Sequence, residues 1–187
     1  MTPDRSTIVD FIADIIERRG SETYLGEAVS MRAHFLQCAH LAENDDAPDT
    51  LVAAALMHDI GHYLGEFDDD ALNNGINNWH DEAGAAVLRN FFSAAVVEPV
   101  RMHVNAKRYL CAVEPTYFAK LSPASVQSLE VQGGPFSAQE VAEFERSPWL
   151  DDAIRLRRYD EGAKDIDAVT PDFNHYRPLL ASLVLTD

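Results

Sequence analysis

The segment from residue 51 to residue 57, with the sequence LVAAALM, carries an apolar side chain at every position. A helix that is apolar on all sides has no face to present to water, so this segment predicts a central helix packed among others. The next two residues, His58 and Asp59, are thereby delivered into the interior. A buried imidazole and carboxylate are costly unless they are paired or bind a metal ion. The sequence therefore predicts a polar site within an apolar core.

Apolar residues elsewhere recur at helical spacing, and strict alternation of the kind that strands show is scarce. The expected fold class is all-α. Helices are expected at residues 6–19, 27–42, 48–60, 81–92, 94–110, 123–131, 137–146, 148–159 and 175–185. An acidic, asparagine-rich loop at residues 65–79 is long enough to act as a lid. Because no repeat or linker interrupts the pattern, residues 1–187 are expected to form a single domain.

The charge of the chain limits its partners. The 187 residues include 31 acidic and 15 basic side chains, for a formal net charge of -16. Without a basic patch, this charge disfavours nucleic acid and an anionic membrane, and no apolar run approaches the length of a membrane span. Cys38 and Cys111 lie in apolar stretches and favour reduced thiols in a cytoplasmic protein. No sequence feature indicates an oligomeric state.

Histidines cluster on the segments that should form the core. Five of the seven have this placement: His34, His58, His62, His80 and His103. Asp160, at the end of the helix expected at 148–159, adds a second carboxylate to Asp59. Imidazole and carboxylate ligands suit zinc, manganese or iron, and without a cysteine cluster an iron-sulfur site is not expected. Four of these imidazoles, those of His34, His58, His80 and His103, and the two carboxylates suffice for two metal ions if Asp59, in the middle of the cluster, bridges them.

The series His34, His58-Asp59, His62, His80, His103 and Asp160 resembles the HD-domain superfamily, in the subset with enough histidines for a dinuclear centre. A closer similarity is to the PhnZ-type mixed-valent diiron oxygenases, which cleave the carbon-phosphorus bond of 1-hydroxyphosphonates. It extends over nearly the whole chain and includes the segments YLGE at 24–27, LQCA at 36–39, HVNAKRY at 103–109 and LEVQGGP at 129–135. The resemblance implies an HD-domain helical bundle.

The resemblance also implies a ligand set and a cofactor. One iron would be held by His34, His58, Asp59 and Asp160, and a second by His80, His103 and the shared Asp59. Tyr24 would be a ligand of the second iron in the resting state and would leave when substrate binds. The cofactor would be two iron ions in the mixed-valent Fe(II)/Fe(III) state, with O2 as co-substrate.

Further residues would contact the substrate, a small hydroxyphosphonate. By resemblance these are Glu27, His62, Lys107, Arg157, Ser125 and Gln132. His62, four residues after His58, would lie on or near the same helix face and contact substrate rather than metal. From spacing alone, Lys107 and Arg157 would be solvated ends of surface helices, and the resemblance instead favours contacts with the phosphonate. Ser125 and Gln132 would otherwise be an ordinary early helix residue and an ordinary helix end.

Glu27 bears on the identity of the substrate. In the family this position faces an amino group, and a carboxylate there favours a cationic substituent. The inferred substrate is 2-amino-1-hydroxyethylphosphonate, which would give glycine and phosphate; its trimethylammonio analogue, which would give glycine betaine, and hydroxymethylphosphonate remain open. Glu27 would otherwise be a first-turn glutamate that is favoured by the helix dipole.

Two other functions compete with the oxygenase. An HD-type metal-dependent phosphohydrolase would use the same ligands to activate water against a phosphate ester or nucleotide. An inactive HD module that senses a ligand is the third possibility, but no ligand position has been lost. Tyr24, Glu27 and the segment 132–135 favour the oxygenase.

Overall fold

The computed structural model describes residues 3–19, 27–64 and 76–186. They form the α-helices α1 (Ile8–Arg19), α2 (Met31–Asn44), α3 (Asp49–Met57), α4 (His80–Leu88), α5 (Ala94–Val113), α6 (Pro123–Val131), α7 (Ala138–Phe144), α8 (Leu150–Gly162) and α9 (Phe173–Leu183). Two short 3-10 helices, η1 (Ile60–Tyr63) and η2 (Phe118–Lys120), complete the set. In this part of the chain, β structure is limited to isolated bridge residues, such as the pair Phe92 and Val184, so the all-α prediction is confirmed.

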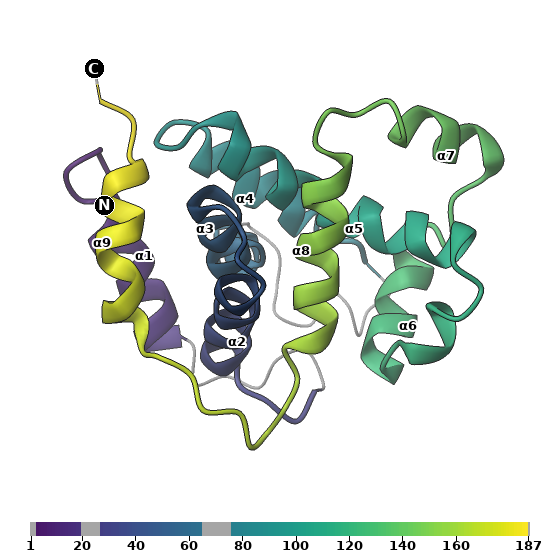
Figure 1. The fold of residues 1–187 in the computed structure, drawn as a ribbon, viewed down its shortest axis with the longest axis horizontal. Helices are drawn as coiled ribbons and strands as arrows, with labels where there is room; N and C mark the ends of the chain where they lie inside the picture. The colour runs from purple at the N-terminus through teal and green to yellow at the C-terminus, as the bar shows by residue number, and fades with distance from the viewer. Residues whose placement is uncertain (1–2, 20–26, 65–75, 187) are drawn as a thin grey trace.

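Helix α3 is the centre of the bundle. Every side chain from Leu51 to Met57 is buried, as the apolar run predicts. The helix packs against α2, α5, α8 and α9, and Figure 1 shows it between the pair α1 and α9 on one side and α8 on the other. Helices α6 and α7 lie beyond α5 and α8, on the far side from α1. The residues that follow α3 therefore enter the middle of the fold.

Two predicted helix ends near the site are wrong, and local interactions explain both. The helix expected at 27–42 begins only at Met31, because Ser30 caps it by accepting a hydrogen bond from the amide of Ala33 at 3.2 Å. The helix expected at 48–60 ends at Met57, and η1 follows after a turn. Gly61 in η1 packs so closely on α4 that a Cβ there would lie 1.8 Å from the carbonyl oxygen of His80.

Helix α8 also differs from its prediction, because it runs to Gly162 rather than to residue 159. Arg157 pairs with Asp160 and with Glu161, which lie three and four residues later, and such pairs stabilise a helical turn. Asp160 therefore lies inside the last turn of α8 and not after it. Since α8 packs on both α5 and α2, this turn faces the region that follows α3.

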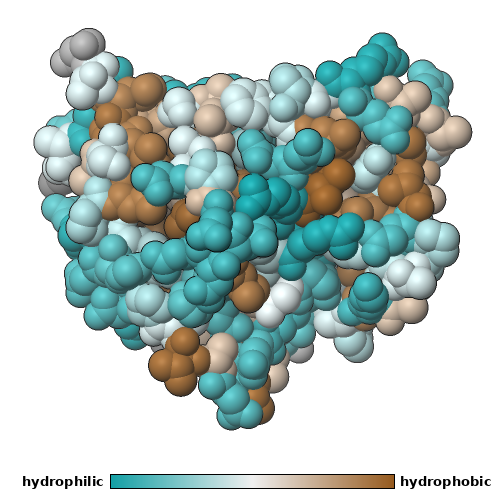
Figure 2. All heavy atoms as spheres, in the orientation of Figure 1, coloured by the Kyte–Doolittle hydropathy of each residue, from teal (hydrophilic) through white to brown (hydrophobic). Residues whose placement is uncertain are grey.

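The surface is consistent with the acidic composition. Hydrophilic side chains occupy a broad band across the middle of the face that Figure 2 shows. Both cysteines are free thiols, and Cys38 is buried. In the described segments, no helix has the combination of length and apolar character that crossing a membrane would need.

Candidate metal centre and adjoining pocket

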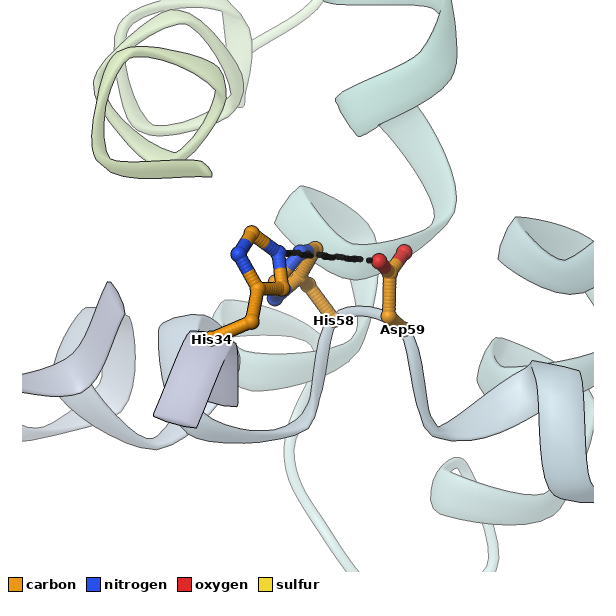
Figure 3. Close-up of side chains that lie close together, drawn as sticks. All are labelled: His34, His58 and Asp59. Atoms are coloured by element: carbon orange, nitrogen blue, oxygen red, sulfur yellow. Dashed lines mark hydrogen bonds and ion pairs between the residues drawn. The ribbon is translucent and has the colours of Figure 1, made fainter. Parts of the chain in front are cut away.

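The turn after α3 carries one half of a cluster of ligand atoms. Nε2 of His34, from α2, lies 3.2 Å from Nε2 of His58. Oδ2 of Asp59 lies 3.7 Å from the first of these nitrogens and 3.4 Å from the second. Figure 3 shows how these three side chains converge. Oδ1 of Asp160 approaches from α8, at 3.5 Å from His34 and 3.9 Å from His58. Two imidazole nitrogens and two carboxylate oxygens thus surround one point.

A second group of ligand atoms lies on the other side of Asp59. Nε2 of His80, at the start of α4, lies 3.1 Å from Nε2 of His103 in α5. Oδ1 of Asp59 is 3.2 Å from His80 and 3.3 Å from His103. Asp59 therefore turns Oδ2 to the first group and Oδ1 to the second, as a carboxylate that bridges two metal ions would. All six of these side chains are buried.

The second ring nitrogen of each histidine in the two groups is held by an acceptor. Nδ1 of His34 donates to the carbonyl of Ala163 at 2.9 Å, and Nδ1 of His58 donates to the carbonyl of Ala55 at 2.9 Å. Nδ1 of His103 donates to the carbonyl of Val100 at 2.7 Å. Nδ1 of His80 donates to Oδ1 of Asn78 at 3.0 Å. Because Nδ1 carries a hydrogen in each ring, the neutral imidazole presents the lone pair of Nε2 to the cluster.

The distances between these lone pairs suit metal ions. Two nitrogens that are each about 2.1 Å from one ion are separated by about 3.0 Å when the ligand angle is near a right angle. The observed Nε2 separations are 3.2 Å in the first group and 3.1 Å in the second. Nitrogen and oxygen donors without thiolate fit iron, manganese or zinc. The residues present therefore fit a dinuclear site.

The carboxylate of Asp160 provides an independent indication. Its Oδ2 accepts a hydrogen bond from Arg157, while its buried Oδ1 has no hydrogen-bond partner among the residues that the structure describes. A buried carboxylate oxygen without a partner is costly. Because Oδ1 points at the nitrogens of the first group, a metal ion bound there would satisfy it.

The pKa values of Asp59, Asp160 and His58 are shifted by the charges that face one another in the cluster. Burial alone would raise the pKa of Asp59, but the imidazoles of His58, His103 and His80 outweigh it and hold that pKa well below its ordinary value. Burial would likewise raise the pKa of Asp160, but the guanidinium of Arg157 outweighs burial and holds that pKa well below its ordinary value. The pKa of His58 is raised despite burial, because of the Asp59 carboxylate. In the metal-free protein His58 thus takes up a proton, which a metal ion must displace.

His62 differs from the four histidines above. The prediction placed it on or near the same helix face as His58, but α3 ends at Met57 and His62 lies in the separate 3-10 helix η1. Its ring stacks on that of His80, with centroids 4.0 Å apart. Asn78 donates to its Nδ1 at 2.8 Å, so the hydrogen of the neutral ring is on Nε2. Burial, and then the charge of His80, lowers the pKa of His62 to about 3. His62 therefore presents an N–H donor, although its Nε2 lies only 4.0 Å from Asp59.

A pocket opens beside the second group of ligands. All six predicted substrate residues lie on its wall: Glu27, His62, Lys107, Ser125, Gln132 and Arg157. Four of the six ligands border it as well, namely Asp59, His80, His103 and Asp160. A molecule in this pocket would therefore touch the metal site, which makes the arrangement suitable for chemistry on a bound small molecule.

The pocket contains two buried cations. Lys107 is 3% exposed, and its Nζ donates to Oγ of Ser128 at 2.7 Å. Burial, and then the charge of Arg157, lowers the pKa of Lys107 to about 7. Arg157 donates from Nε to the hydroxyl of Tyr117 at 2.8 Å and pairs with Asp160 and Glu161. The expectation from spacing that both are solvated helix ends is wrong, because α5 and α8 pack closely against each other.

The remaining pocket residues are held by a polar network. Glu27 lies before α2, so it is not a first-turn glutamate. Its Oε1 accepts a hydrogen bond from Ser122 and lies 3.1 Å from Nζ of Lys164. Ser125 donates to Glu161 at 3.2 Å. Gln132 has a buried Oε1 without a hydrogen-bond partner in the part of the chain that is described.

Some predicted features lie elsewhere. Tyr24 and residues 65–75 of the expected lid are outside the described residues. The last part of that loop, 76–79, reaches the pocket through Ile76, Asn77 and Asn78. His40 and His175 are away from the cluster, bonded to Asn44 and Glu43 respectively. Four further residues of the site were not predicted from the sequence: Asn78, Tyr117, Glu161 and Lys164. Glu161 and Lys164 lie one and four residues after Asp160 in the sequence, and this proximity could have indicated them.

Comparison with known proteins agrees with this geometry. The family model described as "HD domain" matches residues 31–133. The chain is 48% identical over 181 residues to the [1-hydroxy-2-(trimethylamino)ethyl]phosphonate dioxygenase (glycine-betaine-forming) of Leisingera caerulea, covering 97% of this chain and 92% of that protein. It is 42% identical over 169 residues to the hydroxymethylphosphonate dioxygenase of Gimesia maris, covering 90% and 84%.

Proposed function

The chain belongs to the HD-domain family, and we propose that it is an O2-dependent diiron oxygenase that cleaves the carbon-phosphorus bond of a small 1-hydroxyphosphonate. The observation that carries this proposal is that the two carboxylate oxygens of Asp59 face two different groups of histidines. A pocket with buried cations lies directly beside the second group. The names of both similar proteins describe phosphonate dioxygenases.

In this proposal the first iron would be held by His34, His58, Asp59 and Asp160, and the second by His80, His103 and Asp59. Tyr24 would be the resting-state ligand of the second iron. A mixed-valent Fe(II)/Fe(III) pair would activate O2, which is the oxidant of the reaction, and the binding and orientation of substrate depend on the side chains around the pocket. The overall reaction consumes one hydroxyphosphonate and one O2 and gives a carboxylic acid and phosphate.

The pocket residues bind and orient the substrate. Lys107 donates to the neutral hydroxyl of Ser128 and pairs with no carboxylate of the described residues, so its ammonium is available to a phosphonate oxygen. Arg157 uses three of its five N–H donors on Tyr117, Asp160 and Glu161, and two remain. The N–H of His62 and the side chains of Gln132 and Ser125 complete the contacts. These contacts would hold the hydroxyl-bearing carbon near the irons, and such positioning lowers the barrier to reaction.

The substrate that the pocket favours is 2-amino-1-hydroxyethylphosphonate, with glycine as the product. Glu27 provides an acceptor on the wall, and a primary ammonium can donate hydrogen bonds to it. The trimethylammonio analogue, which would give glycine betaine, is the second candidate, because the similar protein from Leisingera caerulea carries that substrate in its name.

A comparison of reactions with and without O2 tests the proposal. Protein loaded with iron is given each of the three hydroxyphosphonates, and phosphate and the organic acid are measured. We expect phosphate release only in the presence of O2, and the fastest turnover with 2-amino-1-hydroxyethylphosphonate. A conventional HD-type phosphohydrolase would instead release phosphate from a nucleotide or phosphate ester without O2, and that result would refute the proposal.

A further inference from the structure

Lys164 lies in contact with Glu27, a residue of the pocket wall. It follows α8, four residues after Asp160, and is not part of the pocket wall, whereas Glu27 is. Its Nζ lies 3.1 Å from Oε1 of Glu27, and the two side chains are only 14% and 13% exposed. An ion pair that is largely withdrawn from water is screened much less than one on the surface. Lys164 therefore offsets much of the charge that Glu27 would otherwise present.

The position of Lys164 is fixed by further oxygen atoms. Nζ donates to Oγ of Ser125 at 2.9 Å and to Oγ of Ser122 at 3.3 Å. It also lies 3.1 Å from Oε1 of Glu161. Because Glu161 pairs with Arg157 as well, its charge is shared between two cations. Lys164 is thus held in place as the cation that faces Glu27.

The two oxygens of Glu27 are in different situations. Oε1 takes both the hydrogen bond from Ser122 and the contact with Lys164. Neither interaction uses Oε2. A cationic substituent that binds Oε2 would share one carboxylate with Lys164, so two positive charges would lie on either side of the same group. Their repulsion in a partly desolvated site opposes the attraction to Glu27.

We propose that Lys164 is a specificity-determining residue, which limits the preference of the pocket for a cationic substituent by partly neutralising Glu27. The proposal rests on the proposed function, because it presumes that a phosphonate with a substituent occupies the pocket. It predicts that, with the ion pair present, a ligand with an uncharged substituent binds only modestly more weakly than one with a cationic substituent. Removal of Lys164 should increase this difference in affinity.

Equilibrium binding tests this without requiring turnover. The iron-loaded protein is titrated in the absence of O2 with 2-aminoethylphosphonate and with ethylphosphonate, and calorimetry gives the two Kd values. The measured quantity is the Kd of ethylphosphonate divided by that of 2-aminoethylphosphonate. Because both ligands bind the same preparation, differences in folding or iron content between variants cancel in this ratio.

We expect Lys164→Met and Lys164→Gln each to raise the ratio roughly tenfold, since an ion pair near a protein surface is governed by an effective dielectric constant of about 20. Lys164→Arg keeps the charge and should leave the ratio within about threefold of the wild-type value. Glu27→Gln should lower it. If Lys164 only anchors Glu27 mechanically, both neutral variants would lower the ratio, and a lowered or unchanged ratio in both would overturn the proposal.

The oxygenase function and the role of Lys164 can be refuted separately. If the wild-type protein releases no phosphate from hydroxyphosphonates with O2 but the ratio rises in the Lys164 variants, the oxygenase function is wrong and the role of Lys164 stands. If phosphate is released as expected and the ratio does not rise, the oxygenase function stands and the role of Lys164 is wrong.

Discussion

Asn78 donates a hydrogen bond from Nδ2 to Nδ1 of His62 at 2.8 Å, and thereby makes His62 a hydrogen-bond donor rather than a metal ligand. The same amide accepts from Nδ1 of His80 through Oδ1, at 3.0 Å, and makes that histidine a potential ligand. One asparagine side chain thus assigns opposite roles to two stacked imidazoles.

The His62→Ala variant should keep its iron and lose activity. Loss of a hydrogen bond to a charged phosphonate costs about 1.5–3 kcal/mol, so kcat/KM should fall about 10- to 100-fold. Iron content and steady-state kinetics measure the two effects. His40→Ala is the matched control, because His40 lies away from the cluster. A fall in iron content in His62→Ala would mean that His62 is a ligand after all.

Substrate binding should weaken as the pH rises, because of Lys107. Burial, and then the charge of Arg157, lowers the pKa of this lysine to about 7 in the free protein. The cationic form binds the phosphonate and predominates below that pKa, so kcat/KM should decline as the pH increases through about 7. In Lys107→Arg the guanidinium stays charged, and the decline should be smaller. An identical pH profile in the variant would exclude Lys107 as the titrating group.

Iron binding should have the opposite dependence on pH. The pKa of His58 is raised in the metal-free protein, where Asp59 outweighs burial, and the proton must leave before His58 can bind a metal ion. The apparent affinity for iron should therefore rise as the pH increases through that raised pKa, with a release of protons on binding. Competition with a chelator at several pH values measures this, and an affinity that is independent of pH would contradict the assignment of His58 as a ligand.

Gly61→Ala should destabilise the fold, because the added Cβ would lie 1.8 Å from the carbonyl oxygen of His80 and only movement of the backbone can relieve the overlap. The expected loss in the free energy of unfolding is about 3 kcal/mol, at the upper end of the usual range for overpacking. Gly162→Ala is the control: there the new Cβ meets a flexible leucine side chain, Cδ1 of Leu41, at 3.2 Å. Denaturant unfolding of the two variants should separate them, and equal stabilities would contradict the close packing of η1 on α4.

The sequence predicts the centre of this fold well, because the run from Leu51 to Met57 leaves few alternatives to a central helix. The six expected ligands converge for the same reason, since each is a polar residue on a segment that must be buried. The positions of Lys107 and Arg157 could not be predicted from spacing, because whether a cation at a helix surface faces water depends on which helix packs against it. Only the resemblance to the diiron oxygenases indicated that Lys107 and Arg157 contact the substrate.

The network behind Glu27 was beyond the sequence for a different reason. Lys164, Glu161 and Ser122 lie far from Glu27 along the chain, and their contacts depend on how α6 and α8 are placed. The start of α2 at Met31 was missed because the Ser30 cap competes with an equally good helical pattern from residue 27. Nothing in the described segments bears on Tyr24, and its role as a resting-state ligand stays a prediction.

The bridging role of Asp59 is the central claim, and the iron content of purified protein tests it most directly. We expect two iron ions per chain in the wild-type protein. In Asp59→Ala both should be lost, because Oδ2 faces one group of histidines and Oδ1 faces the other. Circular dichroism of the metal-free proteins would verify that the variant is folded. One iron per chain in the wild-type protein, or one retained in Asp59→Ala, would contradict the claim.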